Sequence, residues 1–115
     1  MPNHYLSQGD IIDLDFNPQT GHEQAGRRPA LVISNAAFHR YTGLAILCPI
    51  TNQKKDFPLH VKLDNRTRTS GEILCEHVKS LDYRARHAKY VERLPEDILD
   101  KVLKIVSMSI DLERP

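Results

Sequence analysis

The fold of this chain depends on one stretch, residues 21–34, which reads GHEQAGRRPALVIS. Its first half is polar, with two glycines, two arginines, a histidine and a glutamate, and from Pro29 onward it is a continuous apolar run. Polar loops that are attached to a rigid strand are where catalytic and binding groups collect. We therefore expect a functional loop over residues 17–28, leading into a buried central strand over residues 29–34. Proline is tolerated at the first residue of such a strand.

The sequence on either side of this stretch predicts a protein made mainly of β-strands. Residues 10–16 and 58–63 alternate apolar and polar side chains, as half-buried strands do, and residues 44–50 form a second apolar run. We interpret residues 72–81 as one long strand and residues 89–94 as a short one. Five or six short strands favour a small, strongly curved β-barrel.

Two helical segments complete the expected set of elements. A short helical turn is expected over residues 35–41, closed by Gly43. A longer helix is expected to start at Pro95, because proline is common at the first helical position. Its apolar side chains recur at helical spacing, at Leu99, Val102, Leu103, Val106 and Ile110. This helix is expected to cover an open side of the sheet.

Length and charge set broad limits on the protein. The 115 residues form one domain, 1–115. The net charge of +1 neither supports nor excludes binding to nucleic acid, because local patches matter more than the sum. No apolar run approaches membrane-span length, and the N-terminus lacks a signal-peptide pattern. We therefore expect a cytoplasmic protein that does not contact a membrane.

The cysteines and histidines do not form a metal-binding pattern. Cys48 and Cys75 lie in apolar, strand-like runs, and we expect both to be buried, reduced thiols. The pair Cys75 and His77 supplies at most two ligands, whereas a structural zinc site takes four. We expect no metal and no cofactor.

Three segments together point to a known family. The polar loop carries the pattern G-x-E-Q-x-G-x-R-P from Gly21 to Pro29, Thr51 follows an apolar strand, and residues 76–80 read EHVKS. These segments resemble the MazF/PemK family of toxin endoribonucleases of type II toxin–antitoxin systems, and the similarity covers nearly the whole chain. The resemblance implies an SH3-like barrel of five to seven strands with a C-terminal helix, and a homodimer.

The resemblance also implies an activity and a partner. The activity is metal-independent, sequence-selective cleavage of single-stranded RNA or mRNA, which inhibits translation and growth. The partner is an antitoxin of the MazE/PemI type, whose acidic, flexible tail occupies the same groove as the RNA. Arg27, Arg28 and the loop are the expected contacts with that tail.

RNA can be cut without metal when the ribose 2′-OH attacks the adjacent phosphorus and expels the 5′-oxygen. The site must then move two protons and stabilise charge on the phosphate. Arg28 is the first candidate for the phosphate, because a guanidinium fork matches phosphate oxygens and Pro29 keeps the backbone before it extended. A surface arginine, or one paired with Glu23, is the alternative. The resemblance implies a catalytic role for Arg28, because the family has a catalytic arginine at this position.

Three further residues are candidates for the catalytic chemistry. The hydroxyl of Thr51 can donate to a phosphate oxygen, although a turn-initiating or capping threonine is the alternative. His22 can act as base or acid near neutral pH, although a lone loop histidine is usually solvated. Glu23 can orient Arg28, or act as a base if partly buried. The resemblance supports Thr51, and it supports His22 through the PemK-like branch of the family.

Glu76 is the last catalytic candidate. Glu76 and His77 lie on the expected long strand, where alternation places them on opposite faces. Glu76 matches an acidic residue, usually aspartate, with an assigned catalytic role in the PemK-like branch, and His77 stands where glutamine is common. Leu74 replaces an arginine that is also implicated in that branch, which favours the scheme with Arg28 and Thr51.

Other side chains are expected to contact RNA away from the reacting atoms. Lys79 and Arg86 can hold flanking phosphates by their charge. Further RNA contacts are expected from Arg27, Gln24 and His77. Bases of single strands are read by stacking and edge hydrogen bonds. The candidates for stacking are Phe16, Phe38, Phe57 and Tyr83, although Phe16 has the pattern of a core residue.

Two other functions are left open by the sequence. CcdB-like toxins share the barrel but poison DNA gyrase by binding, and such a protein has no need of an arginine and threonine phosphate site. The second alternative is a catalytically silent barrel that only binds a partner. The changes at Glu76 and His77 keep it open, because a fold alone does not guarantee its chemistry.

Overall fold

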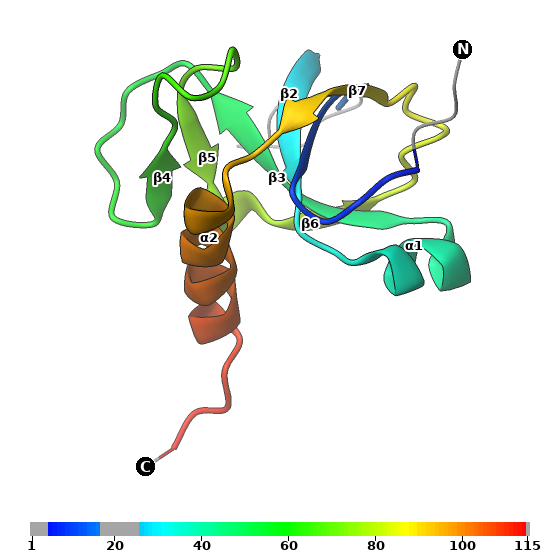
Figure 1. Cartoon of the computed structure of the whole chain (residues 1–115). Helices are drawn as coiled ribbons and strands as arrows, with labels where there is room; N and C mark the ends of the chain where they lie inside the picture. Colours follow the sequence, from blue (N-terminus) through cyan, green and yellow to red (C-terminus); the bar gives the residue numbers. More distant parts are fainter. Residues whose placement is uncertain (1–4, 17–25, 115) are drawn as a thin grey trace.

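The structure is a computed structural model that describes residues 5–16 and 26–114, and it is made mainly of β-strands (Figure 1). Most of the predicted loop over residues 17–28, including His22, Glu23 and Gln24, lies outside the described residues. The described elements are β1 (Asp10–Asp15), β2 (Arg27–Val32), α1 (Ala36–Thr42), β3 (Ala45–Thr51), β4 (His60–Lys62), β5 (Glu72–Leu74), the 3-10 helix η1 (Cys75–His77), β6 (Lys79–Leu81), β7 (Lys89–Arg93) and α2 (Glu96–Ser109).

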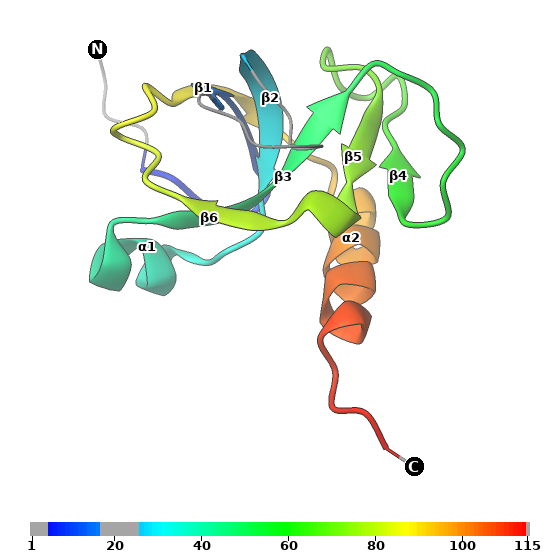
Figure 2. The same cartoon turned by 180° about the vertical axis from the view of Figure 1, so that it is seen from behind.

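The strands form one antiparallel sheet that is organised around β3. The order is β4-β5-β3-β2-β1-β7, and β6 is an additional partner of β3. One edge of β3 pairs with β2, and the other pairs with β6 near the start of the strand and with β5 at its end. Figures 1 and 2 show the strong curvature of this sheet from two sides. The architecture is the predicted SH3-like one, but the barrel is not closed, because the end strands β4 and β7 of the described sheet are not paired with each other.

Apolar side chains are buried on both faces of the central strands. On β2, Leu31 belongs to one core cluster, whereas Ala30 and Val32 belong to the other. This two-sided burial explains why β2 reads as a continuous apolar run. On β1 the predicted alternation is confirmed, because Ile12 and Leu14 share one cluster.

The long strand predicted over residues 72–81 is wrong, because the segment forms β5, η1 and β6. Ile73 pairs with Ile50, and Lys79 pairs with Leu47. The segment therefore advances by six residues while β3 advances by only three. The surplus residues are taken up by η1. A single 3-10 turn is too short to produce a periodic pattern of its own, so the sequence did not reveal the interruption.

Both predicted helical segments form. Asn35 caps α1 by accepting a hydrogen bond from the Phe38 amide at 3.0 Å, and Gly43 ends it with a φ of 73°. Helix α2 packs its predicted apolar face against the core, but it ends at Ser109, and Ile110 beyond it is 79% exposed. Within the described residues, no helix is long and apolar enough to cross a membrane.

The two cysteines are part of the hydrophobic core. Cys48 and Cys75 are free and buried, as predicted. Burial raises the pKa of the Cys48 thiol far above its ordinary range, and burial raises the pKa of Cys75 to about 11. Both thiols therefore stay protonated at neutral pH and are poor nucleophiles.

Candidate active site

Arg28 and Thr51 lie at neighbouring ends of β2 and β3. Strand β2 begins at Arg27, two residues before its predicted start, and Ala30 pairs with Pro49. The strands are antiparallel, so the residue two before Ala30 lies across from the residue two after Pro49. This register places Arg28 across from Thr51. Both line one pocket of about 430 Å³, which we name the β2–β3 pocket. Its lining residues are Arg27, Arg28, Pro29, Ile50, Thr51, Asn52 and Gln53.

Thr51 is held by its own turn. The residue is 4% exposed, and its Oγ1 accepts a hydrogen bond from the Gln53 amide at 3.2 Å. A hydroxyl has one proton to donate and two lone pairs, so this contact does not consume the proton. The capping role that the sequence left as an alternative is therefore present, and it is compatible with donation to a ligand oxygen.

Gly71 supports the backbone of Thr51 from the side of β5. Gly71 has a φ of +114°, and a Cβ at this position would overlap the carbonyl oxygen of Thr51. The next residue, Glu72, pairs with Thr51 in the β3–β5 ladder. The close approach that glycine permits therefore sets the position of the strand end that carries Thr51.

The two adjacent arginines have different surroundings. The Nε of Arg27 donates to the Asp13 carboxylate at 2.7 Å, and its Nη2 donates to the carbonyls of Asp13 at 3.1 Å and His87 at 2.7 Å. Arg27 therefore anchors the pocket wall and joins β1 to the segment before β7. Arg28 is half-buried and lines the pocket, which is the placement that the predicted role on a phosphate needs.

Glu76 is not among the residues that line the β2–β3 pocket. It lies in η1, so the prediction that Glu76 and His77 occupy opposite faces of a strand is wrong. Its Oε2 lies 2.7 Å from Nε2 of His60, whose Nδ1 lies 2.9 Å from Oε1 of Glu72. The side chains of His60 and Glu72 are each 3% exposed, and that of Glu76 is 28% exposed. The Nε2 of His77 lies 3.8 Å from the same Glu76 oxygen.

This arrangement forms a Glu72–His60–Glu76 network with a defined number of protons. Each of its two N···O contacts needs one proton, because carboxylate oxygens only accept. Either His60 is an imidazolium that donates to both carboxylates, or one carboxyl is protonated and donates to the ring. Within the described residues, Oε2 of Glu72 has no hydrogen-bond partner, and an unsatisfied buried oxygen is costly. Because His60 contacts both carboxyl groups, the network connects β4 and β5 to η1 and holds Glu76 in one orientation.

His60 and Glu72 were missed by sequence reasoning. The alternation over residues 58–63 places His60 on the face opposite Val61, and that face was expected to be polar. The pairing of β4 with β5 places His60 diagonally from Glu72. Such cross-strand pairing cannot be read from either strand alone, so neither residue carried a signal.

Lys79 and Arg86 are not among the residues that line the β2–β3 pocket. The Nζ of Lys79 lies 5.5 Å from the ring centroid of Phe16, which is buried as predicted. Arg86 donates from Nη1 to the carbonyl of Asp15 at 3.3 Å. Neither residue lines the pocket, so their contacts with flanking phosphates remain predictions.

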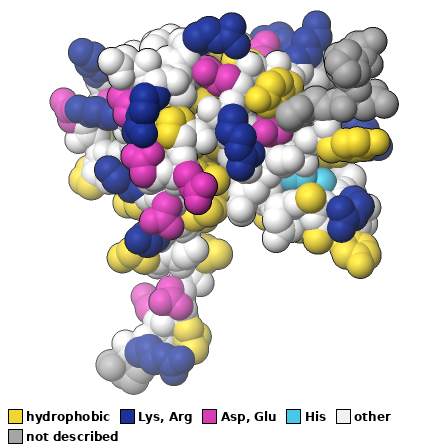
Figure 3. Space-filling view, viewed as in Figure 1, with side chains coloured by type: hydrophobic (Ala, Val, Ile, Leu, Met, Phe, Trp, Pro, Cys, Tyr) yellow, Lys and Arg dark blue, Asp and Glu magenta, His cyan; other side chains and the backbone are white. Residues whose placement is uncertain are grey.

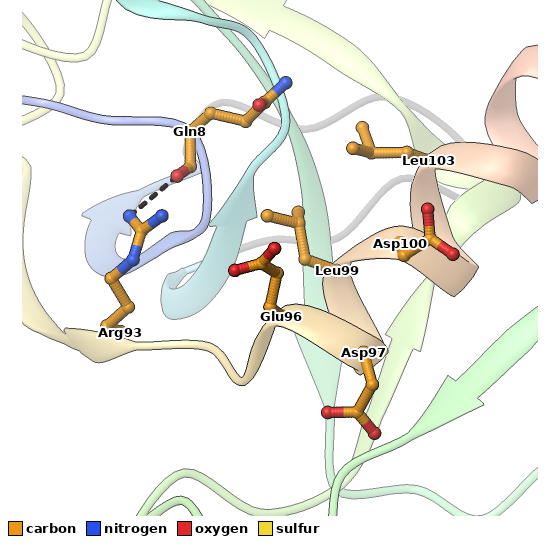
Figure 4. A pocket seen from close by; sticks show the side chains of 7 residues that line it. All are labelled: Gln8, Arg93, Glu96, Asp97, Leu99, Asp100 and Leu103. Carbon is orange, nitrogen blue, oxygen red and sulfur yellow. Dashed lines mark hydrogen bonds between the residues drawn. The ribbon is translucent and has the colours of Figure 1, made fainter.

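A pocket of about 560 Å³ at the start of α2 is unsuited to phosphates (Figure 4). The carboxyl groups of Glu96, Asp97 and Asp100 line it, together with Arg93, which donates to a backbone carbonyl at 2.7 Å. Hydrogen bonds from Arg66 lower the pKa of Asp97, so this carboxylate stays charged at neutral pH. Carboxylates repel phosphate groups. The β2–β3 pocket is therefore the better candidate for an RNA backbone.

The substitution Gly71→Ala is expected to displace Thr51, because the new Cβ overlaps its carbonyl oxygen. We expect a loss of at least about 1 kcal/mol in unfolding free energy, together with shifted backbone NMR signals of Thr51 and Gln53. Gly9→Ala is the matched control, because Gly9 also has a positive φ but approaches flexible side chains. The control should lower stability without moving those signals. Unchanged Thr51 signals in Gly71→Ala would contradict this account.

A double-mutant cycle on His60 and Glu72 is expected to give a coupling energy of about 1–3 kcal/mol, because either single change leaves a buried partner unpaired. The measurement is chemical denaturation at pH 7 and one protein concentration. The control is the exposed pair of Lys62 and Asp56, whose atoms lie 3.1 Å apart. Solvent screens that pair, so no resolvable coupling is expected. Equal coupling in the two pairs would show that the network is not held as described.

The sequence resembles those of known proteins. The family profile described as "PemK-like, MazF-like toxin of type II toxin-antitoxin system" matches residues 7–110. The endoribonuclease PemK of Escherichia coli is 37% identical over 102 residues, covering 85% of this chain and 77% of that protein. The endoribonuclease toxin MazF of Escherichia coli strain K12 is 44% identical over 80 residues, covering 70% of this chain and 71% of that protein.

Solved structures agree with the sequence matches. The crystal structure of MazF from Deinococcus radiodurans gives a TM-score of 0.89 at 39% identity, covering 96% of this chain and 100% of that chain. A MazE–MazF crystal structure from the same organism gives a TM-score of 0.84 at 39% identity and the same coverage. The profile spans nearly the whole chain and the relatives are well above 30% identical. The chain therefore belongs to the family of PemK-like, MazF-like toxins of type II toxin–antitoxin systems.

Proposed function

We propose that this protein is the toxin of a type II toxin–antitoxin pair and an endoribonuclease that cuts single-stranded RNA in the β2–β3 pocket. The observation that carries the proposal is the convergence of Arg28 and Thr51 on one pocket from neighbouring strand ends. Relatives that are named endoribonucleases, such as PemK and MazF of Escherichia coli, support the same activity.

In the proposed reaction the pocket holds the phosphate while the RNA supplies its own nucleophile. The guanidinium of Arg28 binds two non-bridging oxygens, and the Thr51 hydroxyl donates to one of them as negative charge develops. The ribose 2′-oxygen loses its proton to a base and forms a bond to phosphorus. The bond from phosphorus to the 5′-oxygen breaks, and that oxygen takes a proton from an acid. The products are a 2′,3′-cyclic phosphate and a 5′-OH.

The acid and the base are assigned to the residues that the sequence singled out. His22 and Glu23 belong to the predicted loop over residues 17–28 and lie outside the described residues. Glu76 is the remaining candidate: it is not among the residues that line the β2–β3 pocket, and its contact with His60 gives it a partner for proton exchange. Gln24 and His77 are proposed to contact RNA next to the reacting phosphate.

The proposal includes two protein partners. A MazE–MazF structure is among the similar solved structures, which supports an antitoxin of this type. The acidic tail of that antitoxin is proposed from the family resemblance. A second copy of the chain is proposed to complete a homodimer. Figure 1 shows α2 extending away from the sheet, and the apolar side chains of Met108, Ile110 and Leu112 near its end are exposed. A cytoplasmic location is part of the proposal, because mRNA is the proposed substrate.

Arg28→Ala is expected to lower kcat/KM for RNA cleavage by at least about a hundredfold, because a donor to the developing charge is lost. Arg28→Lys should recover little, because the charge returns without the fork. The measurement is cleavage of a labelled RNA by proteins whose far-UV circular dichroism matches that of the wild type. Arg114→Ala is the control, because this exposed arginine lies at the far end of the chain, and its activity should be unchanged. Full activity in Arg28→Ala would remove the central role of this residue.

A further inference from the structure

A third pocket lies at the opposite end of β3 from Thr51. It has a volume of about 530 Å³ and lies next to α1 and the start of the segment that follows β6. The side chains that define it are Tyr5, His39, Arg40, Tyr83 and Arg84, and we name it the Tyr83 pocket. Figure 3 shows this side of the molecule, where hydrophobic and basic side chains lie next to one another over α1. The reaction described above gives no role to Arg40, Tyr83 or Arg84.

The floor of the Tyr83 pocket is formed by His39, which is hydrogen-bonded within the fold. His39 is 6% exposed, its Nε2 lies 2.6 Å from the Ser34 hydroxyl, and its Nδ1 lies 3.2 Å from the Leu6 carbonyl. A carbonyl only accepts, so Nδ1 carries a proton and donates to it. Both ring nitrogens are therefore engaged within the fold. The rings of Tyr83 and His39 make a T-shaped contact with their centroids 6.1 Å apart, so His39 packs against Tyr83.

The walls combine aromatic surface with positive charge. The guanidinium carbon of Arg84 lies 5.7 Å from the centroid of Tyr83, and Arg40 and Tyr5 are exposed at the rim. None of the eight lining residues is acidic. The neighbouring carboxylate of Asp82 caps its own turn by accepting a hydrogen bond from the backbone at 3.0 Å. An aromatic ring beside two arginines matches a base that stacks and a phosphate that is negative.

One segment of chain links this pocket to the β2–β3 pocket. Arg27, in the wall of the β2–β3 pocket, donates to the carbonyl of His87 at 2.7 Å. Tyr83 and Arg84 belong to the same segment, and the Ala88 amide donates to the Tyr83 carbonyl at 3.0 Å, which closes the segment on itself. The step from Arg84 to His87 spans at most about 11 Å. The two pockets are therefore joined by one short stretch of chain, residues 83–88.

We propose that the Tyr83 pocket binds one nucleotide of the RNA substrate, away from the nucleotide that is cut. The base stacks on Tyr83, and Arg84 and Arg40 hold the adjoining phosphates. This assignment rests on the proposed function, because it takes the RNA to be the same strand that is cleaved. The pocket adds affinity without base-edge recognition, because stacking tolerates any base.

The test is a binding measurement that does not depend on cleavage. A fluorescent single-stranded RNA with a 2′-deoxy sugar at the cleavage position is titrated with each protein and followed by anisotropy. Tyr83→Ala should weaken binding by about tenfold, and Tyr83→Phe should keep the wild-type affinity, because the ring is retained. Arg84→Ala should weaken binding and lower the slope of log K against log salt by about one. Tyr41→Ala and Lys101→Ala are controls for an exposed ring and a charge that lie outside the pocket, and their affinities should not change.

RNA length provides a second readout of the same proposal. When nucleotides are removed one at a time from either end, wild-type affinity should fall by about tenfold at one position. Tyr83→Ala should show no drop at that position, because the contact is already lost. This readout holds even if Tyr83→Ala is less stable, since it compares RNAs on one protein.

The outcomes separate this proposal from the proposed function. RNA that is cleaved, and that binds Tyr83→Ala and Arg84→Ala as tightly as the wild type, overturns the Tyr83 pocket alone. RNA that binds in a Tyr83-dependent way, but is not cleaved when its 2′-OH is restored, overturns the nuclease and supports the pocket. Variants that lose affinity for an acidic peptide but keep their affinity for RNA also overturn the proposal.

Discussion

The site depends on how β3 is paired. Its end is held from one side by β2 and from the other by β5, and the absence of a side chain at Gly71 lets the neighbouring backbone approach the carbonyl of Thr51. This pairing sets the distance between Arg28 and Thr51, which no contact within either strand determines. A change that separates the strands by the width of a methyl group therefore acts on the pocket as well as on stability.

Much of the fold was predictable because it rests on local patterns. Apolar runs indicated β2 and β3, and Gly43 marked the end of α1. The broken strand over residues 72–81 was not predictable, because the surplus residues of η1 appear only when the segment is paired with β3. The open edge between β4 and β7 is likewise a property of the assembled sheet.

The candidate site was predicted from the sequence only in part. Arg28 and Thr51 were identified by a motif and by resemblance, and the register of β2 and β3 brings them together. His60 and Glu72 were missed, because their burial results from pairing between β4 and β5. The Glu72–His60–Glu76 network shows that a predicted catalytic residue can have a structural partner that no motif reveals.

The most direct test of the account is the chemistry of the RNA ends. The protein is incubated in EDTA with a long, unstructured RNA, and the cut ends are mapped and identified, with a matching RNA that carries a 2′-deoxy sugar at the cut position. The account predicts discrete cuts that leave a 5′-OH and a 2′,3′-cyclic phosphate, and no cut at the 2′-deoxy position. Cuts that leave a 5′-phosphate, or cuts at the 2′-deoxy position, would contradict the claim that the ribose 2′-OH is the nucleophile and that the pocket binds the phosphate.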